Sequence, residues 1–234
     1  MQAVILAAGE GTRLRPLTLH TPKAMVPING RPMLEILLSQ LKSAGISDVV
    51  IVVYYLKEKI MDYFGDGSKF GMKIKYAVQK GIKGSADAVA QAEPFVTDKR
   101  FFVIACDSLF ETDLLNRVMA HKSEGMFTCK EVVDGRRYGI LITEGKRVKR
   151  IIEKPEVPPS NLANFSVYVF PREIFDACKK VPAGLKGEHW LPDAIQLLID
   201  KGVVFEYEIS KYILDIGTPE QLAEAQDLAR KLGL

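Results

Sequence analysis

The sequence predicts an α/β fold whose sheet is mainly parallel and covered by helices on both faces. Along the first half of the chain, apolar segments of strand length alternate with amphipathic segments of helix length. Several apolar segments are hydrophobic at nearly every position, which is typical of strands buried on both faces. The chain has 234 residues, of which 47% are hydrophobic, so it is long enough to bury a large core.

The first half is expected to alternate strands with helices. The expected strands are Ala3–Ala7, Asp48–Tyr54, Lys73–Val78 and Arg100–Ala105, and the expected helices are Met33–Ala44, Lys57–Phe64 and Ala86–Glu93. Ligands of parallel sheets collect at the carboxyl ends of the strands. Gly9, Gln79 and Asp107 each follow a strand closely, so we expect them to converge at that edge.

The second half is richer in strands joined by short links. The expected strands are Met126–Val133, Gly139–Thr143, Val148–Glu153 and Phe165–Phe170, and the expected helices are Glu173–Lys179, Leu191–Asp200 and Pro219–Leu232. Asp134-Gly135 and Glu144-Gly145 are turn signals between strands. The proline-rich stretch at Pro155–Ser160 is too short for an interdomain linker, so we expect one domain over residues 1–234.

Composition and charge exclude several classes of protein. The net charge is only +3 and the basic residues are scattered, so no nucleic-acid partner is expected. No apolar run has transmembrane length, and the N-terminal segment lacks the basic region and cleavage site of a signal peptide, so no membrane partner is expected. Cys106, Cys129 and Cys178 are widely spaced without metal-ligand spacing, which predicts a reducing, cytoplasmic compartment.

A glycine-rich loop with basic residues follows the first strand. Small residues let backbone N–H groups approach a polyanion, and the cationic side chains can neutralise it. The sequence therefore predicts a phosphate-binding loop, with the candidates Leu6, Ala7, Ala8, Gly9, Gly11, Thr12, Arg13, Arg15 and Lys23.

Two common phosphate-binding loops do not fit this segment. The dinucleotide fingerprint needs a third glycine, but Leu14 occupies that place, and Glu35 lies inside an amphipathic helix instead of ending a strand. A P-loop needs Gly-Lys-Ser/Thr at its end, and the sequence contains no such triplet.

The string from Leu6 to Thr18, followed by Pro22 to Pro27, resembles the signature of the sugar-phosphate nucleotidylyltransferases, in particular glucose-1-phosphate uridylyl- and thymidylyltransferases. The resemblance extends over nearly the whole chain. It implies a Rossmann-like three-layer α/β/α fold with a mainly parallel central sheet. It also implies a nucleotide-binding N-terminal half and a sugar-phosphate-binding C-terminal half. The chain ends before the hexapeptide repeats of the β-helix domain that many relatives carry.

The implied reaction is in-line attack of a sugar-phosphate oxygen on the α-phosphorus of a nucleoside triphosphate. The resemblance implies that Arg13 binds the β- and γ-phosphates, that Lys23 reaches the reacting phosphates, and that Asp107 and Asp215 hold Mg²⁺. Taken alone, Asp215 fits a turn or helix-cap aspartate equally well. Cys106 replaces a glycine of many relatives, and we expect an inert buried thiol there.

The resemblance also implies two groups of binding residues. For the nucleotide they are Gln79, Gly84 and Ser85, and for the sugar phosphate they are Gly139, Glu153, Lys154 and Asn164. Phe165 and Ser166 depart from the Ala-Gly of the family pattern, which leaves the shape of the sugar pocket open. Glu188, His189 and Trp190 could border the sugar site, but a helix-start role for Glu188 and a packing role for Trp190 are favoured.

Transfer from UTP or dTTP to glucose 1-phosphate is the favoured reaction. Guanylyl transfer to mannose 1-phosphate, uridylyl transfer to an N-acetylhexosamine 1-phosphate, and cytidylyl transfer to a phosphorylated alcohol such as phosphocholine stay open. A non-catalytic regulatory module is a further alternative, which the charged residues at 13, 23, 107 and 215 argue against. Many relatives self-associate, and the sequence leaves the oligomeric state open.

Overall fold

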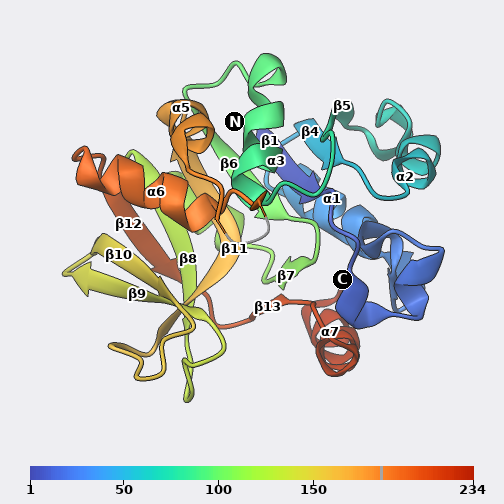
Figure 1. Ribbon diagram of the computed structural model, residues 1–234. Helices are drawn as coiled ribbons and strands as arrows, with labels where there is room; N and C mark the ends of the chain where they lie inside the picture. The colour runs from blue at the N-terminus through green and yellow to red at the C-terminus, as the bar shows by residue number, and fades with distance from the viewer. Residues whose placement is uncertain (185–186) are drawn as a thin grey trace.

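The computed structural model describes residues 1–184 and 187–234, and its centre is one large sheet (Figure 1). The strand order is β5-β4-β1-β6-β11-β8-β12-β10-β9. The strands are β1 (Ala3–Ala7), β4 (Asp48–Val53), β5 (Lys73–Val78), β6 (Arg100–Ala105), β8 (Gly125–Glu131), β9 (Gly139–Glu144), β10 (Arg147–Glu153), β11 (Leu162–Pro171) and β12 (Phe205–Ile209).

The N-terminal half of the sheet is parallel, as expected. Strand β1 lies between β4 and β6, and Ala3 is in register with Val49 on one side and Phe102 on the other. Strand β5 continues the parallel order beyond β4. These central strands are buried along almost their whole length, which explains their continuous hydrophobic sequences.

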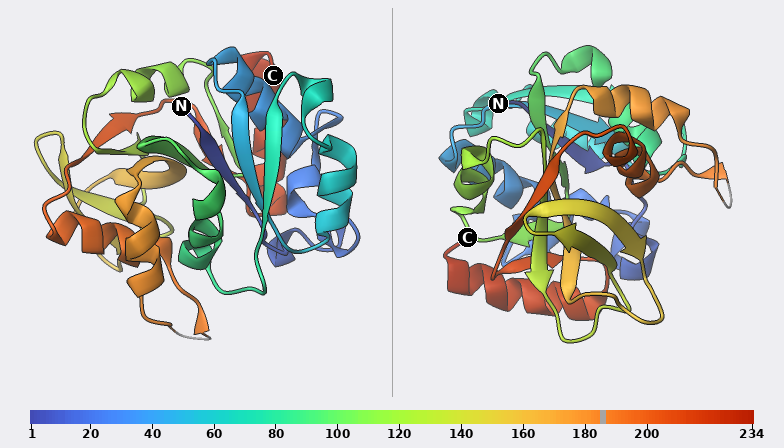
Figure 2. Two further views of the ribbon diagram at one scale, coloured as in Figure 1. Left: turned by 90° about the horizontal axis from the view of Figure 1, so that it is seen from above. Right: turned by 90° about the vertical axis from the view of Figure 1, so that its left-hand side faces the viewer.

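The sheet as a whole is mixed, so the expectation of a mainly parallel sheet is wrong for the C-terminal half. Strand β11 runs antiparallel to β6 and β8, and β9 and β10 form an antiparallel hairpin. The turn at Gly145 is too short for the crossover that parallel neighbours require. Strand β9 also pairs with β11 through Ile140 and Ala163, so this half of the sheet curves back on itself (Figure 2).

Helices cover both faces of the sheet. Helices α1 (Met33–Ser43), α2 (Lys57–Phe64) and α4 (Leu114–Ala120) share a core with Ile5 of β1. Helices α3 (Ser85–Gln91), α5 (Glu173–Lys180) and α6 (Leu191–Asp200) share the opposite core with Val4. Adjacent residues of β1 thus point to opposite faces, as the strand geometry dictates.

A third core attaches the N-terminal loop to the end of the chain. Helix α7 (Pro219–Leu232) packs Leu222 with Leu14 of the loop and Leu214. The loop consists of 3₁₀ turns at Thr12–Leu14, Leu17–Leu19 and Lys23–Met25, followed by the ribbon of β2 (Pro27–Ile28) and β3 (Arg31–Pro32). A second ribbon pairs β7 (Ser108–Phe110) with β13 (Ile213–Asp215). Segments from both ends of the chain therefore meet near Asp107.

The expected helices and strands are confirmed to within a few residues. Strands β2, β3, β7, β12 and β13 and helix α4 were not expected. The sequence of β12, Phe-Glu-Tyr-Glu-Ile, alternates apolar and charged residues and could have been recognised as a half-buried strand.

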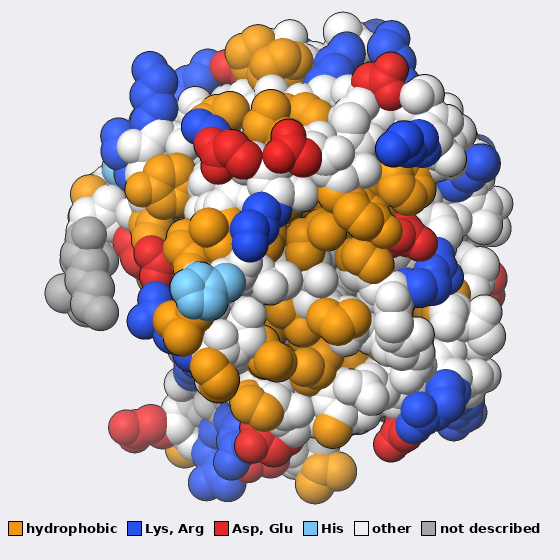
Figure 3. Space-filling view, turned by 90° about the vertical axis from the view of Figure 1, so that its right-hand side faces the viewer, with side chains coloured by type: hydrophobic (Ala, Val, Ile, Leu, Met, Phe, Trp, Pro, Cys, Tyr) orange, Lys and Arg blue, Asp and Glu red, His pale blue; other side chains and the backbone are white. Residues whose placement is uncertain are grey.

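The helices of the described residues can be compared with the length and hydrophobicity that a membrane-spanning helix requires. None of the helices there is both long and apolar enough to cross a bilayer. Apolar side chains do gather between the charged ones on the face that carries β5 and α2 (Figure 3).

Candidate active site

A cavity of about 710 Å³ opens beyond the carboxyl ends of β1 and β6. Most of the expected catalytic and sugar-phosphate residues line it, although they come from distant parts of the chain. The predicted residues among its walls are Arg13, Ser85 and Asp107 from the N-terminal half and Gly139, Glu153, Lys154, Asn164 and Asp215 from the C-terminal half.

The other predicted residues lie outside the cavity wall. They are Leu6, Ala7, Ala8, Gly9, Gly11, Thr12, Lys23, Gln79 and Gly84, together with Arg15. Arg15 pairs instead with Glu10 at the surface, with 3.2 Å between Nη2 and Oε2. Ala7 and Ala8 are buried in the two cores on opposite faces of the sheet.

The N-terminal loop folds tightly against Lys23. Gly11 has a φ of 64°, and a Cβ atom on it would lie 3.1 Å from both Lys23 Cβ and Thr18 Cγ2. The Thr18 hydroxyl donates a hydrogen bond of 2.8 Å to the carbonyl of Gly11. Glycine is therefore required here both by its backbone conformation and by the close approach of Lys23.

Lys23 forms an ion pair with Asp107, and each side chain is only 15% exposed. Burial alone would lower the pKa of Lys23, but the negative charge of Asp107 and its hydrogen bond raise it overall. The ammonium is therefore held as a cation in a partly desolvated place, where its charge acts strongly on nearby groups.

The ribbon of β7 and β13 places Asp215 beside Asp107. Asp215 is in register with Ser108, and the Ile216 N–H donates to the carbonyl of Asp107 at 3.0 Å. Burial and the charge of Asp107 raise the pKa of Asp215 to about 6, against the opposing hydrogen bonds from Ser108 and Ser166. Two carboxylates that repel each other in a buried place form a donor set suited to a hard cation.

These carboxylates do not form a complete metal site by themselves. No group of three or more His, Cys, Asp or Glu side chains with metal-binding geometry occurs in the part of the chain that the structure describes. A divalent cation held by Asp107 and Asp215 would therefore need further ligands, and substrate phosphates commonly supply them.

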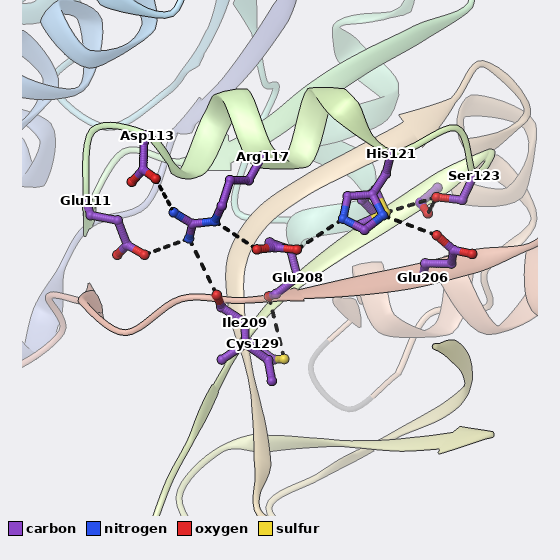
Figure 4. Close-up of polar contacts among 11 residues, drawn as sticks. Glu111, Asp113, Arg117, His121, Ser123, Cys129, Glu206, Glu208 and Ile209 are labelled. Carbon is purple, nitrogen blue, oxygen red and sulfur yellow. Dashed lines mark hydrogen bonds and ion pairs between the residues drawn. The ribbon is translucent and has the colours of Figure 1, made fainter. Parts of the chain in front are cut away.

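A charged cluster secures the far end of the same ribbon (Figure 4). The carboxylate of Glu111 accepts hydrogen bonds from the Tyr212 N–H at 3.0 Å and from Arg117 at 2.8 Å. Arg117 of α4 also donates to Glu208 of β12 at 2.8 Å, and Glu208 contacts His121 at 3.0 Å. The unexpected elements α4 and β12 thus support the ribbon whose strand β13 carries Asp215 and whose strand β7 directly follows Asp107.

Arg13 extends into the cavity next to the segment after Asp215. A Cβ atom on Gly217 would lie 2.7 Å from Nη2 of Arg13, so the guanidinium rests directly on this glycine. The Gly217 N–H donates to Oε1 of Gln221 in α7 at 2.9 Å. The absence of a side chain at position 217 thus makes room for Arg13.

The expected nucleotide-binding segment docks on the residues before α6. The side-chain nitrogen of Gln79 donates to the carbonyl of Gly84 at 3.1 Å and to Asp87 at 2.9 Å. Ser85 Oγ accepts a hydrogen bond of 3.0 Å from the Leu191 N–H. Gly84 has a φ of 88°, and a Cβ there would lie 2.7 Å from the backbone nitrogen of His189.

Replacing Gly84 by alanine is expected to destabilise the protein by about 1–3 kcal/mol, because backbone atoms of His189 block the new methyl group. Urea unfolding measures the change. Gly81→Ala is the matched control, since Gly81 also has a positive φ but a Cβ on it would have no atom within 4 Å. Equal losses in both variants would show that backbone strain, rather than the contact with His189, matters.

The residues expected to bind the sugar phosphate converge at the β9–β10 hairpin and β11. Gly139 is in register with Glu153, and a Cβ on Gly139 would lie 3.0 Å from Glu153 Oε2. Asn164 donates to the hydroxyl of Tyr168 at 2.7 Å, whereas its own Oδ1 is buried and has no partner within the described residues. An unpaired buried acceptor in a cavity wall is suited to a ligand hydroxyl.

Three further residues line the cavity, namely Ser166, Tyr168 and Trp190. Ser166 was expected to affect the shape of the sugar pocket, whereas Tyr168 was not assigned a role there. Ser166 and Tyr168 follow Asn164 at intervals of two along β11, and this spacing could have indicated a shared face. Trp190 is 48% exposed and lines the cavity, so the favoured packing role is wrong, and the structure agrees with the alternative that it borders the site.

Cys106 lies beside Asp107 but is buried, and burial together with the charge of Asp107 raises the pKa of its thiol to about 12. A thiol in this state is a poor nucleophile. We therefore expect Cys106→Ala to retain turnover within about twofold of wild type. Steady-state kinetics measures this, and a loss of several orders of magnitude in a folded variant would indicate covalent catalysis.

Comparison with known proteins agrees with this geometry. The family model described as "Nucleotidyl transferase" matches residues 2–231. The UTP–glucose-1-phosphate uridylyltransferase AglF of Haloferax volcanii is 39% identical over 233 residues, which are 97% of this chain and 95% of the relative. The bifunctional protein GlmU of Methanocaldococcus jannaschii is 37% identical over 226 residues, and the chain spans 53% of its length.

A solved structure has the same fold over almost all of this chain. It comes from Bacillus anthracis, is described as a glucose-1-phosphate thymidylyltransferase, and was obtained in complex with sucrose. It aligns with a TM-score of 0.87 at 28% sequence identity and covers 98% of this chain and 95% of its own. Because the family model spans nearly every residue and the cavity brings together Arg13, Asp107 and Asp215, the chain belongs to the nucleotidyl transferase family and is a nucleotidyltransferase.

Proposed function

We propose that the protein transfers a uridylyl or thymidylyl group from UTP or dTTP to glucose 1-phosphate, forming a nucleoside-diphosphate sugar and pyrophosphate. The observation that carries this proposal is the single cavity shared by Arg13, the two aspartates and the sugar-side residues Glu153 and Asn164. The similarity to the Haloferax volcanii uridylyltransferase supports the choice of substrates.

The reaction needs positioning and charge neutralisation more than acid–base chemistry. An anionic oxygen of the sugar phosphate attacks the α-phosphorus, and the bond to the β-phosphate breaks with its electron pair leaving on pyrophosphate. Arg13 binds the departing pyrophosphate, and Lys23 adds positive charge beside the reacting phosphates. Mg²⁺ held by Asp107 and Asp215 would supply further neutralisation of the phosphate oxygens.

The sugar side offers complementary polar groups. Glu153 accepts hydrogen bonds from sugar hydroxyls, and the unpaired Oδ1 of Asn164 accepts another. Lys154 provides a cation for the sugar phosphate. These acceptors favour a polyhydroxylated substrate over phosphocholine, whose trimethylammonium group donates no O–H hydrogen bond.

The hydrogen bonds of Gln79 bear on the choice of base. Its side-chain nitrogen is used by Gly84 and Asp87, which leaves Oε1 as an acceptor for the nucleotide. Uracil and thymine present an imide N–H to such an acceptor, and guanine presents an amide N–H. This arrangement is compatible with binding of UTP or dTTP.

Pyrophosphate release tests the proposal directly. The purified chain is incubated with Mg²⁺ across a grid of nucleoside triphosphates and acceptors, namely glucose, mannose and N-acetylhexosamine 1-phosphates and phosphocholine. We expect the strongest signal with UTP or dTTP and glucose 1-phosphate. A signal confined to another pair would replace the substrates, and silence from a folded protein that binds nucleotide would favour a regulatory module.

A further inference from the structure

Three donors from two strands hold the carboxylate of Asp215. The hydroxyl of Ser108 donates to Oδ1 at 2.6 Å. The backbone N–H and the hydroxyl of Ser166 both donate to Oδ2, at 3.2 and 2.8 Å. A carboxylate has about four acceptor positions, two on each oxygen. The two bonds from Ser166 therefore fill Oδ2, and one position stays open on Oδ1.

We propose that Ser166 makes Asp215 a one-oxygen ligand and thereby selects a small divalent cation over a large one. This inference rests on the proposed function, because it takes Asp107 and Asp215 as the cation ligands. Ser166 does not touch the reacting atoms in this scheme. It is a positioning residue that acts through Asp215, and it lines the same cavity.

The partner carboxylate is restricted in a similar way. Lys23 forms an ion pair with Oδ2 of Asp107, and both side chains are mostly buried. One oxygen of each aspartate is thus already engaged, which disfavours binding of a cation through both oxygens of one carboxylate.

Carboxylates that bind through one oxygen suit Mg²⁺ better than Ca²⁺. Mg²⁺ demands six ligands in nearly octahedral geometry and is usually bound by one or two carboxylates together with phosphates. Ca²⁺ accepts six to eight ligands and often takes a carboxylate through both oxygens. Occupation of Oδ2 by Ser166 therefore disfavours the bidentate contact that would benefit Ca²⁺.

The test compares cation affinities of the full chain without nucleotide or sugar. Mn²⁺ replaces Mg²⁺ as an octahedral probe and is added up to millimolar concentration. Electron paramagnetic resonance of the free ion gives the Mn²⁺ affinity, and displacement of bound Mn²⁺ by Ca²⁺ gives the Ca²⁺ affinity. The variants are Ser166→Ala, Ser166→Gly and Ser166→Thr. Ala and Gly remove the hydroxyl and keep the N–H, whereas Thr keeps both. We expect the preference for Mn²⁺ over Ca²⁺ to fall about tenfold in the Ala and Gly variants and to be retained in the Thr variant.

Ser210→Ala is the matched control. Ser210 is fully buried and its hydroxyl also donates to a carboxylate, that of Glu111, at 2.5 Å, but it does not contact Asp215. We expect its cation preference to equal that of wild type. A change of the same size in this variant would show that loosening of the ribbon, rather than release of Oδ2, causes the effect, and would overturn the proposal.

Three other results would also overturn the proposal. The wild type could fail to bind Mn²⁺, the folded Ala and Gly variants could keep the wild-type preference for Mn²⁺ over Ca²⁺, or these variants could lose affinity for both cations equally. If the Ala variant does not fold, the Gly and Thr variants decide. The failure of the proposed function is separately visible, because it appears as absent pyrophosphate release even where the cation preference behaves as expected.

Discussion

Replacing Asp107 by asparagine is expected to lower kcat by about 10³-fold or more at saturating substrate, while the protein stays folded. Asp107 lies at the end of β6, pairs with Lys23 and faces Asp215 across the ribbon. Asparagine has nearly the same shape but no charge. The variant therefore loses the proposed cation ligand and leaves the Lys23 ammonium without its ionic partner. Steady-state pyrophosphate release at several Mg²⁺ concentrations measures the effect.

The nearby Asp113→Asn variant is the control. Asp113 also pairs with a cation, Arg117, at 2.6 Å, but its side chain is 67% exposed and does not line the cavity. Removal of such an exposed pair changes stability by only about 0–1 kcal/mol, so turnover should stay close to wild type. Turnover of Asp107→Asn near that of this control would contradict a role for Asp107 in holding the cation.

The central strands and the N-terminal loop could be predicted because their local sequences carry the information. Buried parallel strands are apolar at nearly every position, and this pattern identified β1, β4 and β6 directly. The loop from Leu6 to Thr18 is contiguous, so its glycines and arginines are visible together in the sequence.

The support of the carboxylates could not be predicted in the same way. The two bonds from Ser166 to Asp215 join residues 49 positions apart, and the one from Ser108 joins residues 107 positions apart. The ribbon strands β7 and β13 have only three residues each, too few for a hydrophobic period. The mixed direction of the sheet depends likewise on how distant strands pair, which local patterns do not encode.

Replacing Arg13 by alanine is expected to lower kcat by about 10²–10³-fold, because the cavity loses a guanidinium that can bind phosphate. The loss of stability should be small, because Arg13 is exposed and its removal leaves no buried partner unpaired. If Arg13 binds the departing pyrophosphate, kcat should fall more than the affinity for the sugar phosphate. The measurement is a full steady-state analysis with each substrate varied. A rise in the KM for the sugar phosphate alone would assign Arg13 to that substrate instead.

The glycine under Arg13 permits a second test that leaves the arginine in place. A Cβ at position 217 would lie 2.7 Å from Nη2 of Arg13, which is the free end of a flexible side chain and can move away at little cost. Gly217→Ala should therefore fold normally and still lose much of the activity lost in Arg13→Ala, and the double variant should be no worse than Arg13→Ala alone. Such non-additivity is the sign of two residues acting through one interaction. Full activity in folded Gly217→Ala would show that the position of the guanidinium on this glycine is not the one used in the reaction.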